Sequence, residues 1–193
     1  MRIGVRAIIL DVGTAVLLFG EVALAQTAMH QEGAADLPPN LFAILQDNSN
    51  PAVKRCIDLQ HVPFEKMVHT SWLDLNPTQQ PALLVEGLPP CLSGSDNGTK
   101  LFYIRSDDGW RKILDGLGAR VELKVTRTHG WRDIVLWRHN SAFDSTQLLY
   151  QFDGNVYRAI RCNLVESANP LTGKRRSPPK YSPCTWDWQG ARL

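Results

Sequence analysis

Residues 121–136 read Val121-Glu-Leu-Lys-Val-Thr-Arg-Thr-His-Gly-Trp-Arg-Asp-Ile-Val-Leu136, and they carry the clearest structural signal in the chain. Val121, Leu123 and Val125 alternate with polar residues, and this period of two predicts a half-buried β-strand. A turn at His129 follows, and residues 133–137 then predict a second strand, rich in β-branched and aromatic residues. The chain is therefore expected to double back here as an antiparallel sheet.

Similar strand patterns lie on both sides of this hairpin, and two of them are joined by Asp-Gly pairs. Asp108-Gly109 separates residues 101–105 from 110–114, and Asp153-Gly154 separates 148–152 from 156–161. Because Asp-Gly accepts positive φ at both central positions of a two-residue turn, each pair predicts a tight hairpin.

The strands are arranged as two similar units. Residues 81–85 and 132–136 are 51 positions apart, and the two Asp-Gly turns are 45 apart. The pattern predicts two four-stranded antiparallel meanders, repeat 1 at about residues 72–117 and repeat 2 at about 120–163. They are expected to pack together as a small sandwich, or in an open arrangement capped by the N-terminal helices. Coincidence among common β-patterns is the alternative to a true repeat. The expected fold class is mainly β (α+β), with short helices before the sheets.

Other segments flank the meanders. Residues 1–25 have a basic start, an apolar middle and Ala23-Leu24-Ala25, which predicts a secretory signal peptide, with a retained anchor or an ordinary first helix as alternatives. Residues 26–40 are expected to form a flexible leader and 41–70 to be helical, with Pro51 at a first helical position. A Pro-rich, irregular tail is expected over 164–193, so that 41–193 form a single β-rich domain.

All four cysteines follow the predicted cleavage site. An even number in an exported chain predicts two disulfides, for which three connectivities are possible. Cys56–Cys91 and Cys162–Cys184 are favoured, because each pair brackets one irregular segment. No Cys-x-x-Cys spacing is present, so zinc or thioredoxin-type chemistry has little support.

Composition limits the classes of partner. The formal net charge is +2, which is too close to neutral to predict nucleic acid as a partner. No segment after residue 25 is long and apolar enough to predict a membrane span. A secreted or periplasmic protein is expected, with no membrane span after signal cleavage.

The stretch from Trp72 to Val85, with Asp74-Leu-Asn-Pro-Thr78 inside it, resembles the FG-GAP and VCBS repeat signature, as does Gly130–Leu136. Phe152-Asp-Gly-Asn-Val-Tyr-Arg158 is similar to a hairpin of uncharacterised exported bacterial β-rich proteins. The resemblance implies propeller blades and a calcium loop, but Thr78 stands where an acid is expected, and two units cannot close a propeller. No metal and no cofactor are therefore predicted.

The sequence contains no recognisable catalytic set. It lacks the Gly-x-Ser-x-Gly frame of a nucleophile elbow and any phosphate-binding glycine loop. His129, Asp133 and His139 lie within eleven residues and define one alternative, a secreted hydrolase. However, Asp133 and His139 should be about 20 Å apart along a strand.

The candidate binding residues are three tryptophans and two histidines of the repeat region: Trp110, Trp131, Trp137, His129 and His139. Exposed aromatic side chains bind glycans and proteins, although core packing explains tryptophans in a small β-protein more often. The leading hypothesis is a non-enzymatic module that binds a protein or a glycan. A secreted hydrolase and an inhibitor or immunity-type protein are the alternatives. The basic run at residues 174–180 predicts a solvated loop, or a weak contact with anionic surfaces.

Overall fold

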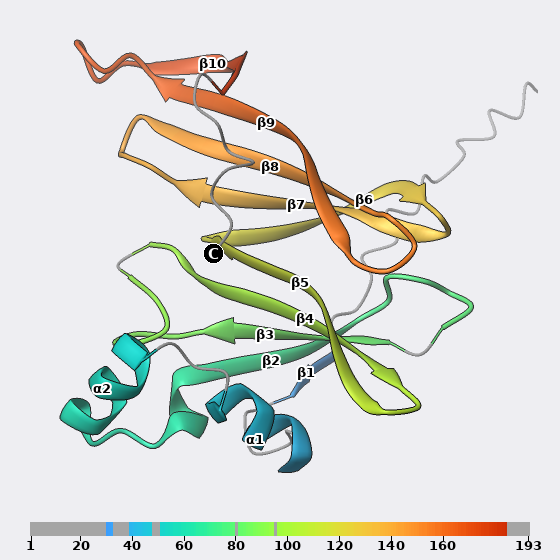
Figure 1. Cartoon of the computed structure of the whole chain (residues 1–193). Helices are drawn as coiled ribbons and strands as arrows, with labels where there is room; N and C mark the ends of the chain where they lie inside the picture. The colour runs from blue at the N-terminus through green and yellow to red at the C-terminus, as the bar shows by residue number, and fades with distance from the viewer. Residues whose placement is uncertain (1–29, 33–38, 48–50, 80, 95, 185–193) are drawn as a thin grey trace, which may run out of the picture.

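The computed structural model describes residues 30–32, 39–47, 51–79, 81–94 and 96–184 (Figure 1). The predicted signal peptide, most of the predicted leader and the last nine residues of the predicted tail lie outside these ranges. The described residues form two antiparallel sheets with short helices on one side, which confirms the predicted fold class (Figure 1).

Each sheet contains one of the predicted four-stranded meanders. In spatial order, the first sheet consists of β1 (His30–Glu32), β2 (Val68–Leu73), β3 (Ala82–Gly87), β4 (Gly98–Ser106) and β5 (Gly109–Gly118). The second sheet consists of β10 (Arg175–Pro183), β9 (Tyr157–Ala168), β8 (Asp144–Phe152), β7 (Trp131–His139) and β6 (Arg120–Thr128). Strands β2–β5 therefore correspond in order to β6–β9, while an internal sequence repeat stays a prediction.

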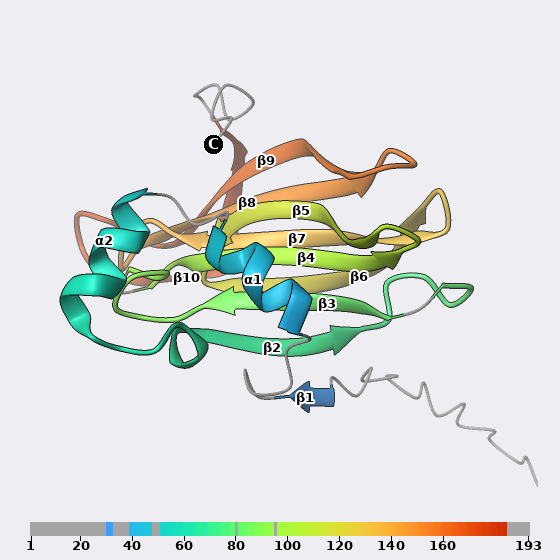
Figure 2. The ribbon, with the colours of Figure 1, turned by 60° about the horizontal axis from the view of Figure 1, so that its bottom comes forward.

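The helical segment consists of three short pieces. These are α1 (Pro39–Asp47), α2 (Pro51–Gln60) and the 3-10 helix η2 (Phe64–Met67). Helix α2 begins at Pro51, as predicted, because the first helical position needs no backbone N–H and suits the fixed φ of proline. Figure 2 shows α1 lying in front of the first sheet.

The outer face of the first sheet packs against these helices and forms the helix-side core. Its buried residues are Leu41, Leu45, Phe64, Val68, Leu83, Val85, Tyr103 and Trp110. The opposite face of the same sheet packs against the second sheet. This inter-sheet core contains Leu73, Leu75, Ala82, Leu84, Phe102, Ile113, Leu114, Trp131, Ile134, Leu136, Phe152 and Tyr157. The molecule thus has three layers: helices, first sheet and second sheet.

Burial on both faces explains the composition of β3. Leu83 and Val85 face the helices, whereas Ala82 and Leu84 face the second sheet. A strand covered on both sides reads as a continuous apolar run instead of an alternating one. The Ala-Leu-Leu-Val run is therefore the sequence signature of a central layer.

The chain passes from the first sheet to the second through a single residue between β5 and β6. The N–H of Ala119 donates to the carbonyl oxygen of Trp137 at 2.7 Å. A Cβ placed on Gly118 would lie 2.8 Å from that same oxygen, so the close approach of β5 and β7 requires glycine. This contact fixes where the two sheets meet.

Strand β6 departs from the predicted alternation. The register between β6 and β7 shifts between Leu123 and Arg127, so the strand is bulged over the intervening residues. Val121 and Leu123 pack against the inter-sheet core as predicted, but Val125 is 88% exposed. The predicted position of Val125 is wrong because a bulge changes the face that the following side chains occupy.

Both Asp-Gly hairpins are confirmed, but their turns are not of the predicted type. Only the glycines have positive φ, 115° at Gly109 and 101° at Gly154. The turn with two positive φ values is His129-Gly130, at 50° and 81°, between Thr128 and Trp131. This is the pattern of a type I′ turn, which matches the twist of the strands that it joins.

Two segments that are predicted to be irregular contribute edge strands. Residues 30–32 of the predicted leader form β1, which pairs with β2. Residues 175–183 of the predicted tail form β10, which pairs with β9 around an irregularity between Arg175 and Lys180. Pro178 and Pro179 are compatible with β10 because an edge strand needs ladder hydrogen bonds on one side only.

Both predicted disulfides are confirmed, and no free cysteine is present in the chain. Cys56–Cys91 joins α2 to the loop between β3 and β4. Cys162–Cys184 joins β9 to the residue that follows β10. One bond therefore holds the helical layer and the other holds the edge of the second sheet.

Buried tyrosines make the fold sensitive to alkaline pH. Burial, together with the negative charge of Asp115, raises the pKa of Tyr103 from 10.0 to about 12. Burial also raises the pKa of Tyr150 and Tyr157. The folded state holds these protons more tightly than the unfolded state, so this contribution to stability is complete below pH 10 and is lost as pH rises towards 12.

We therefore expect the free energy of unfolding to fall by about 2 kcal/mol between pH 9 and pH 11.5 from Tyr103 alone. Urea unfolding at several pH values measures this slope. The variant Tyr103→Phe removes the titrating hydroxyl and should flatten it. Tyrosinate absorbance that develops fully while the protein stays folded would contradict the prediction.

Candidate functional site

Segments of both sheets meet at one end of the sheets and form a cavity of about 320 Å³. We call it the Trp131 cavity. The residues that line it are Gln79, Ile104, Arg105, Ser106, Asp107 and Trp131. They come from the β2–β3 loop, the end of β4, the β4–β5 turn and the start of β7. The cavity thus combines residues from both sheets.

The β2–β3 loop is fixed in position by its own polar groups. Asn76 Oδ1 accepts hydrogen bonds from the backbone N–H and the hydroxyl of Thr78, at 3.0 and 2.9 Å. The carbonyl oxygen of Leu75 accepts from the N–H of Arg132 and from the guanidinium of Arg127, at 2.8 and 3.0 Å. The side chain of Leu75 is buried in the inter-sheet core. The first sheet therefore places Gln79 beside the second sheet through direct contacts.

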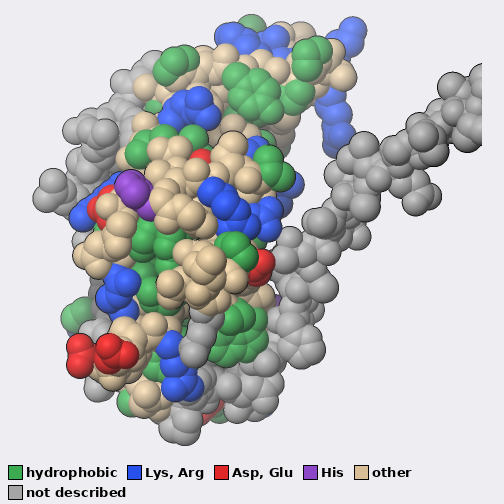
Figure 3. Space-filling model, turned by 90° about the vertical axis from the view of Figure 1, so that its right-hand side faces the viewer, with side chains coloured by type: hydrophobic (Ala, Val, Ile, Leu, Met, Phe, Trp, Pro, Cys, Tyr) green, Lys and Arg blue, Asp and Glu red, His purple; other side chains and the backbone are tan. Residues whose placement is uncertain are grey.

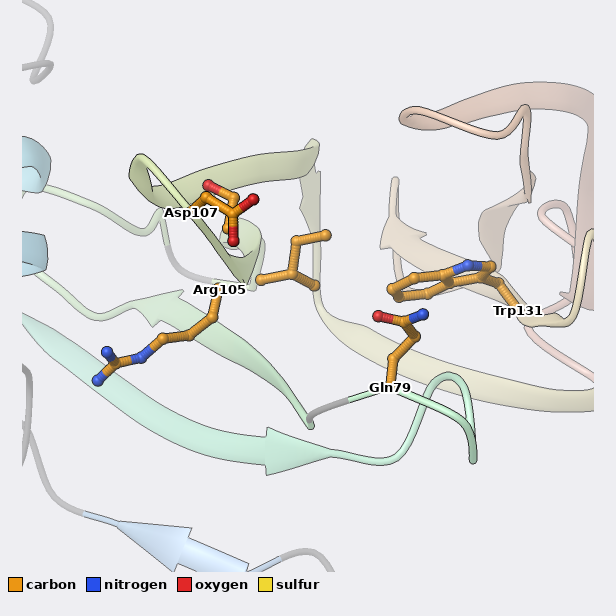
Figure 4. Close-up of a pocket in the computed structure, with 6 residues that line it drawn as sticks. Gln79, Arg105, Asp107 and Trp131 are labelled. Carbon is orange, nitrogen blue, oxygen red and sulfur yellow. The ribbon is translucent and has the colours of Figure 1, made fainter.

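Trp131 forms one wall of the cavity and is held by other aromatic rings. Its indole stacks on Phe152 at a centroid distance of 4.5 Å, and Phe152 contacts Tyr157 edge-on at 5.3 Å. Trp131 is 8% exposed, so only part of the indole faces the cavity. Figure 4 shows the amide of Gln79 next to this ring.

The polar side chains around the cavity differ in what they already bind. Arg105 points away from Trp131 in Figure 4, and its guanidinium lies over Trp110, 5.0 Å from the ring centroid. The hydroxyl of Ser106 donates to the carbonyl of Gly109. In the described part of the chain, the side chains of Gln79 and Asp107 have no hydrogen-bond partner. An amide and a carboxylate are therefore available to a ligand beside an apolar wall.

The surface around the cavity is mixed in character. Figure 3 views this end of the molecule, where hydrophobic side chains alternate with acidic and basic ones. In the nearby β8–β9 turn, Asp153 accepts hydrogen bonds from the N–H groups of Val156 and Asn155 and from Arg158. These bonds lower the pKa of Asp153 from 3.8 to about 2, the backbone bond from Val156 contributing most. Arg111 donates to the backbone carbonyl and side-chain oxygen of Asn155, which ties β5 to this turn.

A second cavity, of about 650 Å³, lies at the opposite end of β7. Asp96 Oδ2 lies 3.4 Å from Nδ1 of His139, and Asn97 bonds both backbone groups of His139 at 2.8 Å. Nε2 of His139 faces the carbonyl oxygen of Ser141, which can only accept a hydrogen bond. Both ring nitrogens of His139 face hydrogen-bond acceptors. This histidine is therefore better placed to hold neighbouring loops together than to act as a general base.

The structure does not bring His129, Asp133 and His139 together. His129 lies in the β6–β7 turn, where Nδ1 contacts the carbonyl oxygen of Phe152 at 2.8 Å. His139 ends β7, ten residues away, which is about 30 Å along an extended strand. Asp133 is buried, and its oxygens accept hydrogen bonds from the hydroxyls of two threonines and from the amide of Gln151.

The three candidate tryptophans occupy three different environments. Trp110 is buried in the helix-side core, with its ring centroid 6.0 Å from that of Trp72. Trp131 is in the inter-sheet core. Trp137 is half-buried, and its Nε1–H donates to Glu122 at 2.9 Å beneath the guanidinium of Arg120. They form no common exposed face; of the three, Trp131 lines the cavity that Gln79 and Asp107 border.

Gln79, Ser106 and Asp107 are not among the site residues predicted from the sequence. Asp107 directly precedes the predicted Asp108-Gly109 turn, and the antiparallel meander places this turn and residues 74–79 at the same end of the first sheet. Nothing in the sequence shows that Trp131 of the second sheet meets them there, because that meeting depends on how the two sheets pack. A polar residue in a loop becomes informative only when its neighbours in space are known.

Two negative findings apply to the described residues. No group of three or more His, Cys, Asp or Glu side chains among them is placed to hold a metal ion. No helix among them is sufficiently long and apolar to cross a membrane.

Compared with known proteins, the chain matches no family model, no curated protein and no solved structure. The resemblance to FG-GAP and VCBS repeats therefore stays a prediction.

Proposed function

We propose that the chain is an exported recognition module, with no catalytic role, that binds a glycan in the Trp131 cavity. The observation that carries this proposal is the pairing of an indole wall with two available polar side chains, Gln79 and Asp107. The two disulfides are compatible with export, because such bonds persist in oxidising compartments.

The chemistry of the cavity favours a glycan among the candidate ligands. A sugar ring has an apolar face, which suits Trp131 and Ile104, and a rim of hydroxyl groups. The carboxylate of Asp107 accepts hydrogen bonds from hydroxyls, and the amide of Gln79 both donates and accepts. A protein loop placed at the same end of the sheets is the alternative ligand.

The proposal is tested by titrating the purified protein with a panel of oligosaccharides. Calorimetry and tryptophan fluorescence measure the binding. We expect Gln79→Ala and Asp107→Ala each to weaken binding by about tenfold, because each removes about 1.4 kcal/mol of hydrogen bonding to the ligand. Both residues lie in surface loops, so the melting temperature should not change.

Asp108→Ala is the matched control, since Asp108 lies in the same turn and does not line the cavity. Its affinity should equal that of the unmodified protein. Equal affinity in the Gln79 and Asp107 variants would contradict a site in this cavity. Capture of a protein that Asp107→Ala releases, without glycan binding, would favour the protein alternative.

A further inference from the structure

The edge of the second sheet extends into a basic hairpin that the Trp131 cavity does not involve. We call residues 158–183, which include most of β9, its turn and β10, the basic arm. Among the described strands, β10 pairs only with β9, and Figure 1 shows it at the opposite edge of the molecule from α1 and α2. The arm is therefore the outermost part of the second sheet.

The tip of the basic arm is an ordered turn that presents one apolar side chain. Asn169 Oδ1 accepts hydrogen bonds from the N–H groups of Leu171 and Thr172, at 2.9 and 3.3 Å. The N–H of Gly173, where φ is 67°, donates to the carbonyl of Asn169 at 2.8 Å. These bonds hold Leu171 outward, where it is 93% exposed.

Charge is concentrated on the same hairpin. Residues 158–183 contain six basic side chains and one acidic side chain, a net charge of +5, whereas the whole chain carries +2 and the remainder therefore carries −3. Glu166 pairs with Arg176 and Lys180, at 3.4 and 3.2 Å. Lys174 and Arg175, next to the tip, are exposed and form no ion pair within the described residues.

From this arrangement we infer that the tip of the basic arm docks on the surface of an anionic lipid bilayer. Lys174 and Arg175 would face lipid phosphates, and each basic side chain close to such a surface contributes about 1 kcal/mol. Leu171 would enter the interface between headgroups and acyl chains. An exposed leucine beside exposed cations suits a bilayer better than a soluble polyanion, which offers no apolar phase.

The test is co-sedimentation of the purified protein with vesicles of phosphatidylcholine alone or with 30% phosphatidylglycerol. We expect binding to the anionic vesicles only, and weaker binding at higher salt, because screening reduces the attraction. The double variant Lys174→Glu/Arg175→Glu should weaken binding by at least about 25-fold, which corresponds to about 1 kcal/mol per site. Leu171→Asp should weaken it by at least about tenfold.

Each variant has a control with the same change in charge. Arg55→Glu/Lys66→Glu places two reversals on the exposed helical layer, and Val125→Asp alters an exposed apolar residue on β6. Both controls should bind vesicles at least tenfold more tightly than the tip variants. Equal binding by tip and control variants, or equal binding to neutral vesicles, would overturn the inference. So would binding to soluble polyphosphate that depends on Lys174 and Arg175 and not on Leu171.

The outcome of the vesicle test does not depend on whether the proposed glycan site is correct. Glycan titration is performed without vesicles and depends on Gln79 and Asp107, which lie on other loops. If glycan binding is found and vesicle binding is not, the inference about the basic arm is wrong. If vesicle binding is found and glycan binding is not, the proposed glycan site is wrong.

Discussion

Reduction of both disulfides should lower the free energy of unfolding by about 7 kcal/mol. The chain-entropy model gives about 4 kcal/mol for a cross-link across 35 residues and about 3 kcal/mol for one across 22. Domains of this size have a total stability of about 5–15 kcal/mol. The reduced protein is therefore expected to be marginal, and urea unfolding followed by tryptophan fluorescence, with and without reductant, measures the difference.

The two bonds can be removed separately, because they lie in different parts of the fold. Cys56→Ala/Cys91→Ala should chiefly expose amides of α2 and the β3–β4 loop to hydrogen exchange. Cys162→Ala/Cys184→Ala should chiefly expose amides of β9 and β10 to hydrogen exchange. Since one bond joins α2 to the β3–β4 loop and the other joins β9 to the residue after β10, their effects should add within about 0.5 kcal/mol. An unchanged unfolding midpoint after reduction would show that the cysteines are not bonded in solution.

The sheets are predictable from sequence because local patterns specify them. Alternation at Val121 and Leu123 indicates a strand covered on one face, and the two Asp-Gly pairs locate hairpins. The alternation and the turns depend on neighbouring residues, so a single sequence is enough. The predicted Cys56–Cys91 pairing is also correct, but the reason given for it is wrong, because the segment that it brackets contains β2 and β3.

Features that depend on packing between distant segments are less predictable. Val125 follows the alternating pattern, yet a register shift leaves it exposed. Pro178 and Pro179 indicate a loop, because the sequence does not show that their strand is an edge. Gln79 and Asp107 of the first sheet share a cavity with Trp131 of the second, where the carbonyl of Leu75 accepts a hydrogen bond from the N–H of Arg132 in β7. Tertiary contacts decide each of these cases.

Asp133 provides the second large effect, since one buried carboxylate holds the bulged part of β6. The hydroxyls of Thr126, inside the bulged stretch, and of Thr128, just after it, each donate to it at 2.7 Å. The amide of Gln151 donates from β8 at 3.3 Å. Asp133 itself is 3% exposed, so its loss leaves these donors without their buried acceptor.

We expect Asp133→Ala to lower the free energy of unfolding by about 3 kcal/mol, because a hydrogen bond to a charged acceptor contributes about 1.5–3 kcal/mol and the donors recover part of this by rearrangement. Thr126→Ala, which removes one donor, should cost about 1.5 kcal/mol, and exposed Asp108→Ala less than about 0.5 kcal/mol. Urea unfolding measures all three. If Asp133→Ala left stability unchanged but abolished a hydrolytic activity, the carboxylate would be catalytic and the hydrolase alternative would replace the recognition module. If instead stability falls most for Asp133→Ala, less for Thr126→Ala and least for Asp108→Ala, the hydrogen bonds from Thr126 and Thr128 to Asp133 hold β6 in place beside the Trp131 cavity.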